Sequence, residues 1–459
     1  MKSAIYFLTV LLILGCAHSA KEAPRNLANT EPKISDFSPY NYEILFTEPV
    51  CKEYRYTSEV RSRSGKVLAA KPRNVYCDPK NDLEASGNRE KSPQKRLVDW
   101  INDPSTKEVF FTYLSFSNKA VKEALCQNAK SRQLKVKFVL DSGTDFKAAD
   151  DLVACEPSLI SYHKRGNVVG LGLAHNKIFI FNPQSSDEIR IVFSSGNMTT
   201  GPVLHHENWH FIKTNVRSHF AQAHLCVMNT ENDDAATASR KAYMESVRSC
   251  RAQITTPEET DIRTFFMPGE GESGFDNKSG RKTAFDYIVN GDGTHPGLNQ
   301  AKQVWLACHR FLHKDLMATL GARLASNDFS LRITADDDTF YDANDKDYKK
   351  AGGTVPQEWM NIKKLMSQGA EAKFMETNPA VHQLHHSKFI IIDDQAVVAG
   401  AANFTQAAFR TNMENIYYIT IPEVVRSFRA YYDKQWNTMA TSIDDLPTKG
   451  NLSSVISDR

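Results

Sequence analysis

Two histidine–lysine pairs occupy matching surroundings that are far apart in the sequence. His175 precedes Lys177 and an apolar run, and His386 precedes Lys388 and a second apolar run. Such runs predict β-strands, in which residues two apart share a face. Each pair therefore places an imidazole and an ammonium group on one side of a sheet. Cations on a buried face are costly unless something compensates them, and a bound phosphate would do so.

The polar residues that follow each pair also recur. Asn197 and Glu207 follow the first pair as Asn403 and Glu414 follow the second. Two such sets meeting at one phosphodiester would supply what its cleavage needs. One neutral imidazole attacks phosphorus and forms a phosphohistidine, while the other, protonated, donates to the leaving oxygen and then activates water. Lysines and asparagines would stabilise the charged phosphate oxygens, so this chemistry requires no metal or cofactor.

The chain around these sets is itself repeated. Residues 109–144 align with residues 304–339, and each segment reads as an apolar strand, an amphipathic helix and a second strand closed by Asp141 or Asp336. Strands that alternate with helices indicate an α/β fold. We therefore expect two similar lobes, each a mixed β-sheet flanked by helices. A pseudo-twofold axis would bring both histidines to one phosphate.

The expected organisation has five parts. Residues 1–20 read as a signal peptide, 21–70 as an irregular N-terminal tether, 71–255 as the first lobe, 256–440 as the second lobe, and 441–459 as a polar tail. Local composition sets the ends, and the repeat sets the two lobes.

The N-terminus predicts export. Residues 4–15 are apolar except for Thr9, a stretch too short to span a bilayer but typical of a signal peptide. The following Cys16 completes a sequence similar to a bacterial lipobox, which would make the chain a membrane-anchored lipoprotein. Cleavage after Ser19 or Ala20 is the alternative, and it would give a secreted or periplasmic protein.

Export would permit disulfide bonds. Sequence spacing favours three local pairs, with buried free thiols as the alternative, because spacing alone does not fix connectivity. These pairs are Cys51–Cys77, Cys126–Cys155 and Cys226–Cys250.

The second set contains a His-x-Lys-x4-Asp motif, from His386 to Asp393, which resembles the signature of the phospholipase D superfamily. Residues 400–405, GAANFT, resemble that family's Gly-x-x-Asn-Phe-Thr element. The first lobe departs from the motif, because Asn182 stands where the final Asp is expected. The resemblance covers about residues 72–440, in both lobes.

The resemblance implies a site drawn from both halves of the chain. It implies that His175 is the nucleophile and His386 the acid, that Glu207 or Glu414 orients the catalytic imidazole, and that the motif Asp is mainly structural. The expected site residues are His175, Lys177, Asn197, Glu207, His386, Lys388, Asp393, Asn403 and Glu414. The histidines nearby are expected to face solvent; they are His205, His206, His382 and His385.

The substrate class is less determined than the chemistry. The net charge of +2 gives no overall attraction to nucleic acid, and both motifs lie in one chain, as in the family's phospholipases. We therefore expect a monomeric enzyme that hydrolyses glycerophospholipids, at a membrane surface, to phosphatidic acid and free head group. The alternatives are a metal-independent secreted endonuclease and a catalytically inactive phosphate-binding protein.

Overall fold

The computed structural model describes eight stretches of the 459-residue chain. These are residues 40–47, 60–61, 67–68, 82–272, 281–326, 328–340, 356–377 and 383–446. The predicted signal peptide, Cys16, the Cys51–Cys77 pair and His382 lie outside the described residues.

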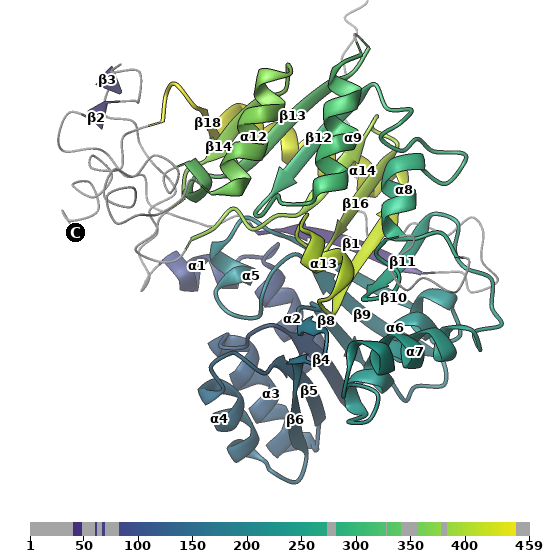
Figure 1. Ribbon diagram of the computed structural model, residues 1–459. Helices are drawn as coiled ribbons and strands as arrows, with labels where there is room; N and C mark the ends of the chain where they lie inside the picture. The colour runs from purple at the N-terminus through teal and green to yellow at the C-terminus, as the bar shows by residue number, and fades with distance from the viewer. Residues whose placement is uncertain are drawn as a thin grey trace, which may run out of the picture.

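The first lobe is built on an eight-stranded sheet (Figure 1). Its three parallel strands β4, β5 and β6 adjoin antiparallel neighbours on both sides, so the sheet is mixed. In spatial order the strands are β1 (Asn41–Phe46), β10 (Asn208–Asn215), β9 (Glu188–Ser194), β8 (Ile178–Phe181), β4 (Glu108–Tyr113), β5 (Lys135–Asp141), β6 (Ile160–Val168) and β7 (Leu171–Leu173).

The second lobe repeats this arrangement. Its parallel strands are β12, β13 and β14, and β12 pairs antiparallel with β15 as β4 pairs with β8. The spatial order is β11 (Ile262–Met267), β17 (Glu414–Ile419), β16 (Ala396–Gly400), β15 (Phe389–Ile392), β12 (Gln303–Cys308), β13 (Ser330–Asp336), β14 (Glu371–Met375) and β18 (Ala440–Ser442). The predicted α/β fold with two similar lobes is confirmed.

Helices cover the outer faces of both sheets. In the first lobe these are α2 (Pro93–Asn102), α3 (Lys119–Arg132) and α4 (Lys147–Cys155), which share a core with the sheet. In the second lobe they are α8 (Ala284–Asn290), α9 (Lys314–Leu324), α12 (Gln357–Ser367) and the short α13 (Gln406–Arg410). Two further short helices are α1 (Asp82–Asn88) and α5 (Gly201–Leu204), and β2 (Val60–Arg61) pairs with β3 (Val67–Leu68).

A third core joins the inner faces of the two sheets. It contains side chains from α6 (His219–Asn232), α7 (Arg240–Arg251) and α14 (Pro422–Lys434), together with residues of both sheets. The rings of Phe193 and Tyr417, one from each lobe, stack with their centroids 3.7 Å apart. This shared apolar core fixes the lobes against each other. Figure 1 shows the first lobe in blue to teal and the second in green to yellow.

The segments expected before the first lobe and after the second lobe need correction. Residues 41–46 form β1, the edge strand beside β10, so the tether expected over 21–70 is wrong for this segment. Its Tyr42 and Ile44 enter the shared core, a burial that six residues of mixed polarity did not reveal. The polar tail expected from residue 441 begins too early, because β18 pairs with β14 and Leu446 is buried.

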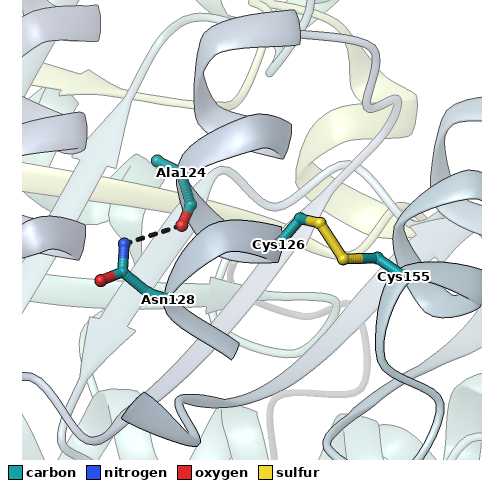
Figure 2. The surroundings of a disulfide bond; sticks show 4 residues. All are labelled: Ala124, Cys126, Asn128 and Cys155. Carbon is teal, nitrogen blue, oxygen red and sulfur yellow. Dashed lines mark hydrogen bonds between the residues drawn. A yellow bond between two sulfur atoms is a disulfide. The ribbon is translucent and has the colours of Figure 1, made fainter. Parts of the chain in front are cut away.

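Two of the predicted disulfides are confirmed. Cys126–Cys155 joins α3 to the end of α4, and Cys226–Cys250 joins α6 to α7. Figure 2 shows the first, with Asn128 two residues after Cys126 on α3; the side-chain amide of Asn128 donates to the Ala124 carbonyl at 2.8 Å. Each bond joins two consecutive helices, the first pair on the outer face of the first sheet and the second pair on its inner face.

None of the helices in the described part of the chain combines the length and the apolar character needed to cross a membrane.

Candidate active site

The two histidines lie on equivalent junctions between the lobes. The His175 amide donates to the Met413 carbonyl at 2.9 Å, and the His386 amide donates to the His206 carbonyl at 3.1 Å. The segment before β8 forms a parallel bridge with the second lobe, between Ala174 and Met413. The segment before β15 forms a parallel bridge with the first lobe, between His385 and His206. The repeat therefore delivers both imidazoles to the interface between the lobes.

Each imidazole is paired with a glutamate of the opposite lobe. His175 Nδ1 donates to Glu414 Oε2 at 2.6 Å. His386 Nδ1 lies 2.9 Å from Glu207 Oε1, at ion-pair distance but without hydrogen-bond alignment. Both carboxylates are fully buried. We call these the crossed His–Glu pairs; they hold Nδ1 of each ring and leave Nε2 for chemistry.

Besides burial, the lysines of both lobes lower the pKa of both histidines. Burial lowers the pKa of His175 and of His386, and the lysine of the opposite lobe lowers each further, Lys388 for His175 and Lys177 for His386. Glu414 partly offsets the effect at His175, raising its pKa. Each histidine is thus within electrostatic reach of the lysine of the other lobe, which agrees with the position of both at the junctions between the lobes.

The lysines are themselves buried and held by the histidine backbones. Lys177 Nζ donates to the His175 carbonyl and lies 3.0 Å from its Nε2, and Lys388 Nζ donates to the His386 carbonyl at 2.6 Å. Burial lowers the pKa of Lys177 to about 8 and that of Lys388 well below its usual value. Repulsion from Lys177 contributes at Lys388. Two buried ammonium groups that repel each other favour an anionic ligand.

The two asparagines lie on the loops after β9 and β16. Asn197 and Asn403 are both half-buried, and the Oδ1 of each is buried with no hydrogen-bond partner among the residues described. The loop of Asn197 wraps Glu207 closely, since a Cβ at Gly196 would overlap its carboxylate. Because an amide oxygen accepts hydrogen bonds, a ligand or a water that donates would satisfy each of these two atoms.

Asp393 is the predicted site residue that the structure places elsewhere. It follows the far end of β15, about 16 Å along the strand from Lys388. Its carboxylate accepts from the backbone amides of Lys302 and Gln303, at the start of β12. Asp393 therefore holds two strands together and is not part of the pocket.

Asn182 performs the same task in the first lobe. Its Oδ1 accepts from the Lys107 and Glu108 amides at 2.7 and 3.3 Å, at the start of β4. Asn182 and Asp393 also share a left-handed backbone, with φ of 55° and 50°. Because the role is that of an acceptor for backbone amides, the departure from the family motif leaves the site intact, as expected for a structural residue.

Two aspartates at the pocket were seen in the sequence only as strand ends. Asp141 accepts from the Ala174 amide at 2.7 Å, and Asp336 accepts from the His385 amide at 2.5 Å. Each therefore holds the residue directly before a catalytic-site histidine. The equal spacing of Asp141 and Asp336 in the repeat was the signal that could have identified them.

The additional histidines were expected at the surface, and this was wrong for those that are described. His205, His206 and His385 are all buried. His205 Nδ1 lies 3.2 Å from Glu207 Oε1. At the equivalent position of the second lobe, the Asn412 side chain donates to Glu414. The three histidines are buried because the junctions between the lobes enclose them, and no local sequence pattern indicates this.

His309 was missed in the sequence altogether. Its ring lies 4.6 Å from that of His386, and in the repeat it aligns with Leu114. The surroundings of His386 thus contain more imidazoles than those of His175.

Among the described residues, two separate groups of side chains are each close enough together to hold a metal ion. The first is His205, Glu207 and His386, whose proximity already follows from one carboxylate facing two imidazoles. The second is Glu272, His313 and Asp315, where Arg410 neutralises Glu272 at 2.6 Å. Since ordinary pairing explains both groups, we assign no metal to either.

Comparison with known proteins gives matches in both sequence and fold. Residues 297–436 match the family described as cardiolipin synthase, PLD-like domain. A mitochondrial cardiolipin hydrolase of Chlamydomonas reinhardtii is 35% identical over 78 residues, which are 16% of this chain and 34% of that protein. The corresponding protein of Danio rerio is 38% identical over 61 residues, 13% of this chain and 26% of that protein. The matches thus span about a third or less of these curated relatives.

The fold has a solved counterpart that spans both lobes. Phosphatidylserine synthase of Haemophilus influenzae Rd KW20 superimposes with a TM-score of 0.51, covering 76% of this chain and 85% of that one at 14% identity. The likeness in fold thus extends over both lobes, whereas the match to the family model lies in the second. The second lobe therefore matches a PLD-like domain over residues 297–436, and the fold of both lobes is similar to that of the synthase.

Proposed function

We propose that this protein is a phosphodiesterase that cleaves glycerophospholipids to phosphatidic acid and free head group. The observation that carries the proposal is the crossed His–Glu pairs, which serve two imidazoles of one buried, cationic pocket. An inactive phosphate-binding protein would need the cations but not an orienting carboxylate for each ring.

The proposed reaction has two displacements at phosphorus. His175 Nε2 attacks, the bond from phosphorus to the head-group oxygen breaks, and His386 gives its proton to that oxygen. His386 then takes a proton from water, whose oxygen attacks phosphorus and releases His175 with phosphatidic acid. The order of the two histidines follows the family resemblance.

The remaining residues of the pocket stabilise charge. Lys177 and Lys388 neutralise the phosphate oxygens, on which negative charge grows as the new bond forms. Asn197 and Asn403 donate to the same oxygens. Glu414 and Glu207 keep both Nδ1 atoms occupied, so that Nε2 of each ring faces the phosphate.

The likeness to known proteins supports lipid as the substrate. The curated relatives are named cardiolipin hydrolases and the matching family is named for cardiolipin synthase, although the matches cover only part of the relatives. Export is part of the proposal too. The two disulfides support it, because such bonds persist in oxidising compartments.

A substrate panel tests the proposal. Purified protein is given phospholipid vesicles, DNA or RNA, each with EDTA, and His386→Asn serves as the inactive control. We expect release of head group from the lipids alone and no release by the variant. Cutting of nucleic acid without lipid hydrolysis would favour the endonuclease instead, and full activity of His386→Asn would refute the two-histidine scheme.

A further inference from the structure

One surface hairpin of the first lobe exposes an unusual amount of apolar side chain. Strands β6 and β7 pair through Gly166 with Leu173 and Val168 with Leu171, so that Val169 and Gly170 form the turn. Val169 is 79% exposed, Val168 42% and Leu173 38%. Among the described residues, Met360 is the one other large apolar side chain exposed to this degree. We call residues 160–173 the valine hairpin.

The turn itself departs from the usual chemistry of hairpins. Two-residue turns favour Asn, Asp and Gly, because these residues tolerate a left-handed backbone and interact well with water. Here Asn167 and Gly170 adopt the left-handed backbone, and valines occupy the two positions between them. The tip is held to the protein through its backbone, because the Arg240 amide donates to the Val169 carbonyl at 3.0 Å, but the exposed β-branched side chain gains nothing in water. Such a local conflict is expected at a functional surface.

The valine hairpin leads directly into the pocket. Its return strand β7 ends two residues before His175, and the Met413 amide donates to the Leu173 carbonyl beside Glu414. Asp141 joins both parts, since it accepts from the Asn167 side chain at 3.0 Å and from the Ala174 amide at 2.7 Å. The exposed tip and the catalytic-site histidine are thus held by one carboxylate.

We propose that the valine hairpin inserts into the surface of a lipid bilayer and docks the pocket against it. A protein partner would need an interface of about 20–30 residues a side, whereas a bilayer surface can take up a tip of two or three apolar side chains. The charge near the tip agrees, because residues 160–175 contain His163, Lys164 and Arg165 and no acidic residue. Asp234 of the neighbouring loop lies within ion-pair distance of both Arg165 and His163, so the exposed Lys164 is the cation that carries this argument.

This inference rests on the proposed function for its substrate, but its test does not depend on turnover. The full exported chain is compared with a V168N/V169N variant, whose asparagines keep the turn favourable. M360N on α12 is the matched control, since Met360 is 46% exposed. Partition onto vesicles of phosphatidylcholine and phosphatidylglycerol is measured by sedimentation, and mass in solution by light scattering.

We expect V168N/V169N to lose vesicle partition about tenfold or more, and M360N to change it less than about twofold. The ratio of vesicle hydrolysis to hydrolysis of a soluble phosphodiester should fall in parallel in V168N/V169N. Wild-type protein that stays off vesicles, equal partition of the double variant, or a change from dimer to monomer in that variant would overturn the inference. Vesicle binding without any hydrolysis would refute the proposed function and leave the hairpin assignment standing.

Discussion

At the scale of residues, the two histidines have equivalent contacts but different surroundings. His175 has a well-aligned hydrogen bond with Glu414, whose other partner is the Asn412 amide. His386 has a looser pair with Glu207, which also faces His205. The pocket is therefore symmetric in its reacting groups and asymmetric in the groups behind them. This asymmetry provides a way to assign separate roles.

Replacing one orienting carboxylate should slow the chemical step. Glu414→Gln removes the charge that supports a protonated or attacking His175, and we expect kcat to fall about 10²–10⁴-fold with little change in KM. Glu272→Gln is the control, since Glu272 also lies beside a histidine, His313, outside the pocket. Steady-state kinetics decide, and a fall in both variants alike would mean that the effect is structural.

His205, which lies beside Glu207, should be replaceable by asparagine, the residue that stands at the equivalent position of the second lobe. His205→Asn copies Asn412 and keeps a donor for Glu207, so we expect activity within about threefold of wild type. His205→Ala leaves the carboxylate with one partner fewer, and we expect a loss of about tenfold. Equal kinetics for the two variants would show that His205 does not support Glu207.

At the scale of elements, the strand ends explain much of what the motifs contain. Asn182 and Asp393 each fix the end of one strand to the start of another, and Asp141 and Asp336 fix the junctions that carry the histidines. The recurrence of these residues could be read from the sequence. Their roles could not, because each depends on backbone amides far along the chain.

Restoring the motif residue in the first lobe should change little. In Asn182→Asp, the carboxylate can still accept from Lys107 and Glu108, while the donor to the Ser105 carbonyl is lost. We expect kcat/KM within about twofold of wild type and a modest loss of stability, about 1 kcal/mol. Thermal unfolding and kinetics together provide the check, and a large fall in kcat with unchanged Tm would place Asn182 in the mechanism.

The helix pairs of the first lobe should depend on their disulfides. The bonds close loops of 29 and 24 residues, so each should stabilise the protein by about 3 kcal/mol through the entropy of the unfolded chain. We expect Cys126→Ser and Cys226→Ser each to lower Tm by several degrees, and reductant to lower the wild-type Tm. An unchanged Tm in reductant would show that the bonds do not form in solution.

At the scale of the whole molecule, the sequence repeat predicted the two lobes and their α/β class, and of the nine expected site residues Asp393 is the one that lies far from the histidines. It did not predict the crossed His–Glu pairs, because each links residues 239 or 179 apart through the packing of one lobe on the other. The same packing hid the burial of His205, His206 and His385. Edge strands such as β1 were missed because they are too short to show a clear period.

Buried neutral histidines should make the whole fold sensitive to acid. Burial lowers the pKa of His206 to about 4 and that of His224 to about 3, below the value of about 6.5 in an unfolded chain. Between these values the unfolded chain binds more protons, so stability is lost as pH falls below about 6.5. We expect Tm to fall steadily from about pH 7 to about pH 5, and a flat Tm over this range would contradict it.

The central claim is that both lobes act on one phosphorus atom, with a single histidine as nucleophile. Its most direct test is a rapid denaturing quench during turnover of a labelled phospholipid, followed by peptide mapping of the covalent adduct. The account predicts an adduct confined to His175, at no more than one for each chain, and lost in His175→Asn. Adducts on both His175 and His386, or turnover without any adduct in a quench that preserves phosphohistidine, would contradict it.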